Sequence, residues 1–493
     1  MRILLLVLLA LPLAGAVVLP WLKDAAATAV AVLVALTGLV MSLVLAVDVG
    51  TSSRPHAVTD ASWIASLGVH FHVGLDGVSS PLMVLTTLLT FLCCVYTVRV
   101  LPAPGRAGQM LALVQLLQAG VLTTFAAADL VLFFVAFEVV LIPMYFLISV
   151  WGGGPAAGHA ATKFVLYTLL GSALMLIGLL LLGIRAGTSD MTVLTQRHGA
   201  GLDSASQLLA FIAIALGLAI KSPLWPLHSW LPDAHTEAPT VGSVLLAGVL
   251  LKMGTYGLIR IAVPDLPTAA HDLAPTLAIL ATVAVVYGAL CCLAQTDLKR
   301  LIAYSSVGHM GFVLLGIATL TSAGIDAALF GNIAHGLITG LLFFLVGGLK
   351  DRHHTGNIAA IGSGLFLRLP RYGALLMFAA VASLGLPGLA GFWGEVLALL
   401  AAYHPAAGLP VALFRVLMAA GFLGTLLTAG YFLLLLSRLA FGPVRPHTEP
   451  HDDVQAVEWL AWAPLVAGTL ALGLYPRMLL AVTHPATLLL VAR

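Results

Sequence analysis

Long apolar stretches, separated by short segments rich in proline and glycine, run along almost the whole chain. Most of them have 18 residues or more, enough to cross a hydrocarbon core of roughly 30 Å as a helix. A segment inside a bilayer has to satisfy its own backbone hydrogen bonds, and helices do so. The pattern predicts an all-α integral membrane protein with about fourteen transmembrane helices. We place them near residues 3–20, 26–47, 78–99, 109–127, 129–150, 160–184, 206–224, 238–262, 272–294, 300–320, 324–349, 372–402, 410–437 and 457–478.

Three connections are longer than the others, and none is long enough to fold as a separate domain. They are residues 48–77, 185–205 and 440–456. In the first, alternating residues from Val69 to Val73 predict a small hairpin.

The first apolar segment follows Arg2 and imitates a secretory signal peptide. Because its apolar run continues through Leu19 and further spans follow, we expect residues 1–20 to be retained as the first helix.

Composition agrees with a membrane protein: 61% of the 493 residues are hydrophobic and 9% are charged. A soluble domain has about a quarter charged residues. The four cysteines form the adjacent pairs Cys93–Cys94 and Cys291–Cys292 inside apolar runs, which indicates small core residues rather than a metal site. Lysine and arginine are more frequent in the odd-numbered connections, which predicts that both termini lie outside.

Four ionisable residues fall inside the predicted spans, namely Glu138, Lys221, Lys252 and Glu395. Each costs roughly 2.5–3.5 kcal/mol at the centre of a membrane helix, so such residues face a partner, a bundle interior or water. Loss of water favours the neutral form of carboxylates and lysines alike, so both can exchange protons near neutral pH. Buried salt bridges that lock helices together are the alternative. Four such residues in four different helices favour a proton pathway.

Two histidines, His309 and His335, also lie inside predicted spans. A single buried histidine is as often a hydrogen-bonded core residue as a functional one. Its pKa near neutrality nevertheless makes histidine suited to link a lysine and a carboxylate in a proton relay.

Breaks in two predicted spans fall beside the charged residues. Pro223 and Pro226 follow Lys221, and Pro387 precedes Glu395 within SLGLPGLAGFWGE. Interrupted spans in corresponding halves of a chain indicate a transporter ion site. The breaks lie five helices apart, in spans seven and twelve, which predicts two inverted five-helix repeats, spans 4–8 and 9–13. The expected organisation is residues 1–108 (helices 1–3), 109–262 (first repeat), 263–440 (second repeat) and 441–493 (helix 14 and tail).

The segment AIKSPLWPLHSWLPDAHTEAPTVGSVLLAGVLLKMGTYGLIRI resembles the signature of the antiporter-like subunits of bacterial respiratory complex I. FEVVLIPMYFLI, TDLKRLIAYSSVGHMGFVLLGI and LPGLAGFWGE match the same family in order and spacing, and the resemblance covers essentially the whole chain. It implies fourteen helices, inverted repeats, broken seventh and twelfth helices, and one proton channel in the subunit.

The resemblance also implies roles for individual residues. Glu138 resembles the carboxylate that pairs with the seventh-helix lysine, which is Lys221, and Lys252 resembles the bridging lysine of the eighth helix. The two histidines resemble those of the central axis, and Glu395 resembles the terminal proton-exchanging residue, where sister subunits have lysine. Phe137 stands where many members have tryptophan, and we expect it to take no part in the proton chemistry.

The activity implied is that of a subunit of a proton-translocating NADH:quinone oxidoreductase, driven by quinone reduction in other subunits. This chain has no G-x-G-x-x-G, P-loop or cysteine ligand set, so we expect no cofactor in it. NADH, FMN, iron–sulfur clusters and quinone are expected in partner subunits, next to neighbouring antiporter-like chains in the bacterial plasma membrane. A subunit of an Mrp-type cation/proton antiporter or of a membrane-bound hydrogenase is the alternative, and a passive scaffold is a third interpretation.

Overall fold

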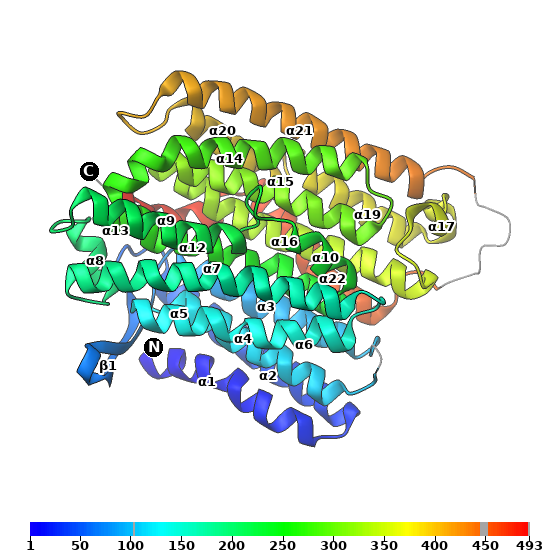
Figure 1. Cartoon of the computed structure of the whole chain (residues 1–493). Helices are drawn as coiled ribbons and strands as arrows, with labels where there is room; N and C mark the ends of the chain where they lie inside the picture. The colour runs from blue at the N-terminus through cyan, green and yellow to red at the C-terminus, as the bar shows by residue number, and fades with distance from the viewer. Residues whose placement is uncertain (102–103, 444–451, 492–493) are drawn as a thin grey trace.

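The computed structural model describes the chain except residues 102–103, 444–451 and 492–493. Its long helices lie side by side in a single bundle and run between the same two ends (Figure 1). Thirteen segments of the described chain are helices long and apolar enough to cross a membrane. They are α1 (Arg2–Val18) with η1 (Leu19–Trp21), α2 (Asp24–Val49), α3 (Ser79–Thr97), α4 (Ala107–Ala126), α5 (Leu130–Val139) with α6 (Leu141–Trp151), α7 (Ala157–Ala186), α9 (Ser204–Lys221), α11 to α13 (Thr240–Asp265), α14 (Pro267–Leu293), α15 (Leu298–Ala318), α16 (Ser322–His353), α21 (Val411–Leu439) and α22 (Ala456–Leu474).

The remaining predicted span, 372–402, is divided into α19 (Pro370–Ser383) and α20 (Ala390–Tyr403). Gly385 and Gly388 between them have φ of +83° and +95°, a conformation that glycine adopts without steric cost. The seventh span is divided as well: α9 ends at Lys221, and the chain becomes helical again in α10 (Trp230–Glu237). Both predicted breaks are therefore confirmed, as is the all-α membrane fold.

Two predicted helices are less regular than expected. The span 129–150 is two helices, α5 and α6, joined at Val140. Pro143 explains the interruption, because proline has no N–H to donate to the carbonyl of Val139 four residues earlier. The span 238–262 contains two π-helical turns, η3 (Leu246–Leu250) and η4 (Leu258–Ala262), on either side of α12 (Leu251–Gly257). Such turns are rare and often occur at functional sites.

The centre of the bundle is formed by α16 and the segment Thr240–Asp265. In each of these two segments, 94% of the residues in the most apolar 18-residue stretch are buried. The corresponding values for α1 and α2, at the edge of the bundle, are 33% and 28%. A polar side chain on the two central segments therefore faces protein rather than lipid. The helices α1 and α2 instead lie along one side of the molecule (Figure 1), and several of their large apolar side chains are exposed.

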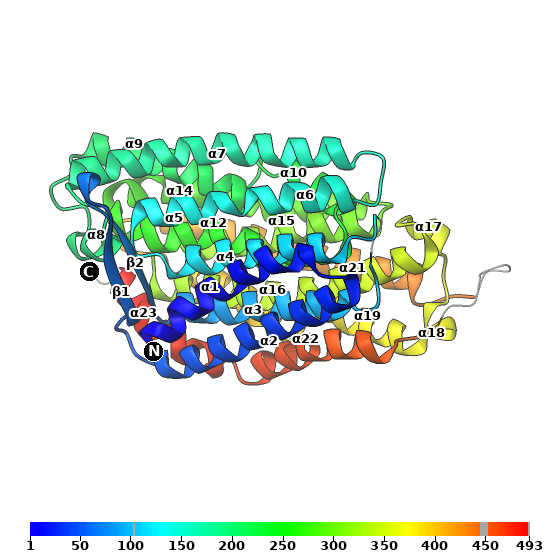
Figure 2. The same cartoon turned by 90° about the horizontal axis from the view of Figure 1, so that it is seen from below.

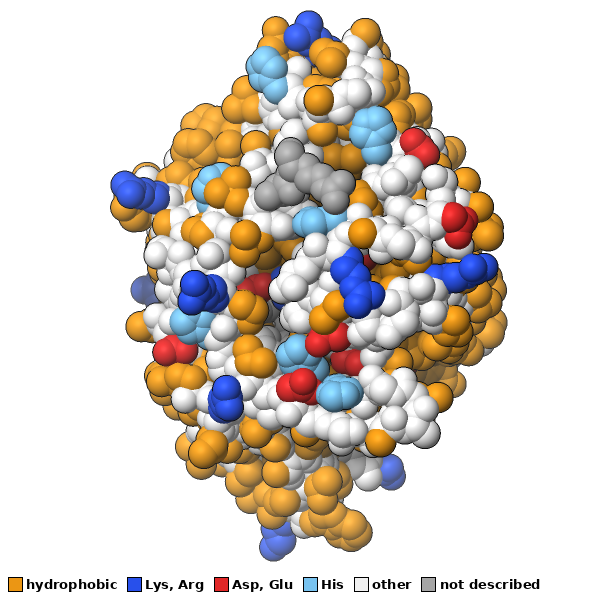
Figure 3. Space-filling view, turned by 90° about the vertical axis from the view of Figure 1, so that its left-hand side faces the viewer, with side chains coloured by type: hydrophobic (Ala, Val, Ile, Leu, Met, Phe, Trp, Pro, Cys, Tyr) orange, Lys and Arg blue, Asp and Glu red, His pale blue; other side chains and the backbone are white. Residues whose placement is uncertain are grey.

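Both termini lie at the same end of the bundle, together with a β-hairpin (Figures 1 and 2). Strand β1 (His56–Ile64) pairs in antiparallel fashion with β2 (Val69–Leu75), which confirms the predicted hairpin. The helices α8 (Met191–Arg197) and α23 (Arg477–Val491) belong to this end, and Figure 3 shows acidic and histidine side chains gathered on it between hydrophobic flanks. The opposite end carries α17 (Ile358–Ile361) and α18 (Leu365–Arg368).

An ion pair attaches the hairpin to the start of α8. The Nδ1 atom of His72 lies 3.3 Å from Oδ2 of Asp190. The contact with Asp190 raises the pKa of His72 above its usual value, although burial opposes the shift. Burial acts to raise the pKa of Asp190, but the contact with His72 and the hydrogen bonds from Thr192 lower it to about 2. Both groups are therefore charged at mildly acidic pH.

Candidate proton-transfer site

Lys252 lies in α12 and is completely buried, with an exposed fraction of 0%. The π-helical turn before it carries the N–H of Leu251 to the carbonyl of Leu246 instead of that of Ala247. The carbonyl of Ala247 thereby loses its usual helical donor, and it accepts a hydrogen bond from Nζ of Lys252 at 2.6 Å. Nζ also lies 2.5 Å from Nδ1 of His335. The irregular helix thus supplies an oxygen that holds the lysine against the histidine.

From His335 a line of titratable side chains continues to Glu395. The rings of His335 and His309 are 5.7 Å apart between centroids. Nδ1 of His309 lies 3.0 Å from Oε1 of Glu395, and its Nε2 lies 2.9 Å from the hydroxyl of Ser383. The hydroxyl of Thr425 donates to Oε2 of Glu395 at 3.3 Å. These groups come from α12, α16, α15, α20 and the helices beside them, so the line exists only in the folded bundle.

A cavity of about 30 Å³ lies between His309, His335, Ser383 and Glu395. It has room for one or two water molecules. Nε2 of His335 is buried and has no hydrogen-bond partner among the described residues. When Lys252 donates to Nδ1, a neutral His335 carries its proton on Nε2, available to a water or to the next histidine. The arrangement is thus capable of proton transfer from Lys252 to Glu395 with at most a short water bridge.

The other predicted pair, Glu138 and Lys221, is arranged more loosely. Lys221 is the last residue of α9 and is 1% exposed, whereas Glu138 in α5 is half-buried. Neither Nζ of Lys221 nor Oε1 of Glu138 has a hydrogen-bond partner within the described chain. The carboxylate nevertheless acts on Lys221 through its charge. The structure therefore places this pair within electrostatic range but not in a direct salt bridge.

The expectation that phenylalanine in place of tryptophan at position 137 leaves the proton chemistry unaffected stays a prediction, although the ring itself contacts Lys221. Nζ of Lys221 lies over the Phe137 ring, 4.8 Å from its centroid. An aromatic face attracts a cation, and the attraction is worth about 2 kcal/mol when the pair is desolvated. Because Nζ of Lys221 has no hydrogen-bond partner among the described residues, this ring is its immediate stabilising neighbour.

Sequence reasoning also missed His235. It is 0% exposed in α10, its ring stacks on Phe343 at 4.4 Å, and neither ring nitrogen has a hydrogen-bond partner within the described chain. The charges of Lys299 and Lys252 both act on it. It lies in a connection, shortly before the predicted span 238–262 and next to the polar residues Asp233 and Glu237, so the sequence gave no sign of burial. No group of three or more metal-ligating residues occurs in the described part of the chain.

Residues 127–435 match the family model described as NADH:quinone oxidoreductase/Mrp antiporter, transmembrane. The chain is 42% identical over 440 residues to NADH-quinone oxidoreductase subunit M of Rhodobacter capsulatus, covering 87% of this chain and 83% of that one. It is 37% identical over 426 residues to NADH-ubiquinone oxidoreductase chain 4 of Marchantia polymorpha, covering 86% and 83%.

Among solved structures, a chain of respiratory complex I from Thermus thermophilus with bound NADH has a TM-score of 0.88 at 31% identity, covering 99% of both chains. A chain of the Mrp complex from Dietzia sp. DQ12-45-1b also has a TM-score of 0.88, at 24% identity over 100% of this chain and 97% of that one, which shows a shared fold. The resemblance noted in the sequence is thus confirmed, and the chain belongs to the NADH:quinone oxidoreductase/Mrp antiporter transmembrane family.

Proposed function

We propose that this chain is a membrane-arm subunit of a proton-translocating NADH:quinone oxidoreductase and conducts protons through its buried polar axis. The observation that supports this most is the line Lys252–His335–His309–Glu395, with contacts of 2.5 Å and 3.0 Å at its two ends. Isolated structural salt bridges do not require titratable groups from several helices to line up in this way. The relatives are named as chains of NADH-quinone and NADH-ubiquinone oxidoreductases, so in this proposal the oxidation of NADH by quinone drives the proton transfer.

In this proposal Lys252 receives a proton, passes it to His335, and returns to the neutral amine. His335 and His309 pass it on, either directly or through water in the cavity between them, and Glu395 takes it up at the broken twelfth helix. A change in the charge or position of Glu138 alters how well Lys221 holds its proton, because the two act on one another without direct contact. That pair is the point at which a signal from a neighbouring subunit reaches the axis.

In this proposal NADH, FMN, iron–sulfur clusters and quinone bind to partner subunits, and antiporter-like chains lie beside this one. The complex in this proposal lies in the bacterial plasma membrane. The two predicted inverted repeats, spans 4–8 and 9–13, are part of the same proposal. An Mrp-type antiporter, whose subunit shares the fold, is the alternative.

Purification in mild detergent separates these two functions. An oxidoreductase subunit copurifies with flavin- and iron–sulfur-containing chains, and NADH drives proton uptake into inverted vesicles that contain the complex. Copurification with membrane chains alone, together with sodium/proton exchange in the absence of NADH, would instead assign the chain to an Mrp-type antiporter.

A further inference from the structure

A second cavity, of about 90 Å³, lies at one end of the bundle, between the ends of α3, α6 and α16 and the start of α15. It has room for several water molecules. Its polar lining consists of Tyr96, Trp151, Thr240, Lys299, Lys350 and Asp351. The indole nitrogen of Trp151 is buried and has no hydrogen-bond partner in the described chain, so a donor is available at the cavity.

This cavity lies at the end of the bundle opposite both termini. Its lining residues come from the ends of the third, fifth and eleventh spans and from the start of the eighth and tenth, which all meet odd-numbered connections. These are the connections richer in lysine and arginine, so the positive-inside rule assigns this end to the cytoplasm. That is the side from which a respiratory proton pump takes up protons.

Burial increases stepwise from the mouth of the cavity toward the axis. Asp351 is exposed and Lys350 is half-buried. Lys299 is 3% exposed, and its Nζ donates to the carbonyl of Ala238 at 2.7 Å. Titratable groups thus extend from solvent to a buried amine within one cavity.

His235 lies three residues before Ala238, which lines the cavity, and its ring stacks on Phe343 of α16, the helix that carries His335. Lys299 and Lys252 are both close enough for their charges to act on this ring. Its two ring nitrogens have no hydrogen-bond partner among the described residues, and the ring is held in place by its stacking on Phe343. A water on either side of such a ring gives it the two hydrogen bonds that buried imidazoles normally have.

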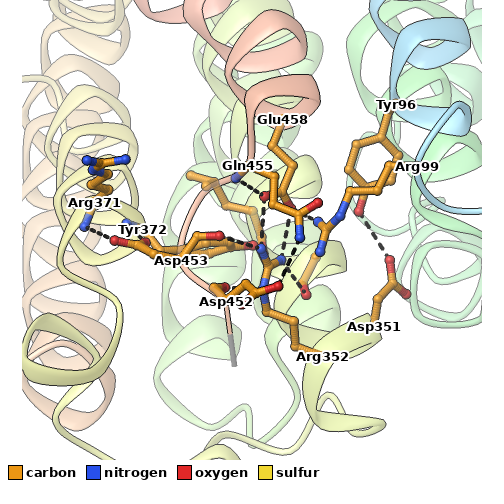
Figure 4. A network of polar contacts seen from close by, with 12 residues as sticks. Tyr96, Arg99, Asp351, Arg352, Arg371, Tyr372, Asp452, Asp453, Gln455 and Glu458 are labelled. Atoms are coloured by element: carbon orange, nitrogen blue, oxygen red, sulfur yellow. Dashed lines mark hydrogen bonds and ion pairs between the residues drawn. The ribbon is translucent and has the colours of Figure 1, made fainter. Parts of the chain in front are cut away.

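One wall of the cavity is held by a polar network (Figure 4). The hydroxyl of Tyr96 donates to Asp351 at 3.1 Å. Next to it, Arg352 donates from both terminal nitrogens to Glu458, at 2.9 and 2.8 Å, and Arg99 donates to the same carboxylate. The network joins α3, α16 and α22, so the mouth of the cavity has a fixed geometry.

We propose that this cavity is the cytoplasmic proton-uptake site of the subunit, and that Lys299 and His235 carry protons from it to Lys252. The inference rests on the proposed function and adds an uptake route that does not pass through Lys221. A proton from the cytoplasm passes along the water in the cavity to the neutral amine of Lys299, and each water that gives up a proton receives another from the cytoplasmic side. The ammonium gives a proton through water to one nitrogen of His235, and the other nitrogen releases its proton to the neutral amine of Lys252. Every transfer breaks one N–H or O–H bond and forms another.

The test compares variants of the assembled complex in inverted vesicles. Lys299→Met removes the proton-accepting group, and Lys299→Arg keeps a charge that does not release its proton. Both are expected to lower NADH-driven proton uptake by about tenfold or more, because a positioned proton-transfer group contributes at least that factor. Arg300→Gln is the matched control: the adjacent side chain is 43% exposed and does not line the cavity, and normal pumping is expected.

Lys252→Met separates failure of this proposal from failure of the proposed function. If the Lys252 variant pumps normally, the buried axis is not the proton path and the proposed function is wrong. If the Lys252 variant fails while Lys299→Arg pumps like the wild type, only the uptake route is wrong.

A labelling experiment applies even if the Lys299 variants do not assemble. Asp351→Cys places a thiol at the exposed mouth of the cavity, and inverted vesicles present the cytoplasmic face to a membrane-impermeant cationic thiol reagent. Modification is expected to inhibit pumping in this variant and neither in the wild type, with its four free cysteines, nor in Arg300→Cys. Complete modification of the introduced thiol with unchanged pumping would overturn the uptake route.

Discussion

Glu395 is the position at which a relay and a structural ion pair make opposite predictions. Its carboxylate contacts His309 at 3.0 Å and the hydroxyl of Thr425 at 3.3 Å, and it is 7% exposed. Glu395→Gln keeps the size and the hydrogen-bonding capacity of the side chain but does not bind a proton. Glu395→Lys reverses the charge yet restores a group that exchanges protons. In the relay, glutamine therefore abolishes pumping through this subunit, and lysine retains a measurable fraction.

The substitution Glu395→Asp allows the size of the expected loss of pumping to be estimated. Removing one methylene withdraws the carboxylate by about 1.5 Å, so the direct contact with His309 is lost. A hydrogen bond to a charged group contributes about 1.5–3 kcal/mol, which corresponds to a factor of about 10 to 150 in a rate or equilibrium constant. The adjoining 30 Å³ cavity has room for a water that bridges the gap, so we expect a loss near the lower limit of that range.

Proton uptake by inverted vesicles, normalised to the amount of assembled complex, checks this order. We expect the wild type to pump best, followed by aspartate, then lysine, with glutamine inactive. A structural salt bridge predicts that lysine is worse than glutamine, because lysine places a positive charge next to His309. Better pumping by the glutamine variant than by the lysine variant, at equal assembly, would refute proton exchange at Glu395.

Four further predictions concern the outer parts of the site and the hairpin. Lys221→Arg should assemble yet lose most NADH-driven pumping, since guanidinium does not release a proton; full activity in sealed vesicles would exclude proton exchange there. Glu138→Asp should keep part of the activity and Glu138→Gln little; equal pumping by both would make this carboxylate structural. Phe137→Trp should pump normally and Phe137→Leu should shift the pH profile of pumping, as the ring stabilises the lysine cation; identical profiles would refute the contact. The pair of His72 and Asp190 should protect the hairpin from proteolysis between about pH 4 and pH 6.5. This protection should fall as the pH rises through the raised pKa of His72 or drops through that of Asp190, about 2; a His72→Gln variant with the same decline above pH 6.5 would contradict it.

The helices were predictable because the bilayer leaves few alternatives. Long apolar runs have to be helical, and Pro223 and Pro387 mark breaks since proline lacks the donor that a continuous helix needs. The alternation of residues from Val69 to Val73 was sufficient to predict the hairpin. The π-helical turn before Lys252 has no comparable sequence signal, because its residues are ordinary helix formers and the turn depends on packing in the centre of the bundle.

The buried charges were predictable as a set, but their partners were not. Charge at membrane depth stands out in any sequence, so Glu138, Lys221 and Glu395 were evident. That Lys221 contacts Phe137 rather than a carboxylate depends on the rotation of α5 relative to α9, which hydropathy does not encode. The same holds for His235, whose burial results from the way α10 folds back against α15 and α16.

The number of protons translocated per NADH oxidised tests the central claim most directly, in sealed vesicles that contain either the wild type or Lys252→Met. Lys252 is fully buried and its Nζ contacts His335, so replacing it with methionine removes the group that passes a proton to this histidine. The account predicts that the assembled variant either translocates fewer protons per NADH or oxidises NADH far more slowly. An assembled Lys252→Met complex with the wild-type rate and the wild-type ratio of protons to NADH would contradict it.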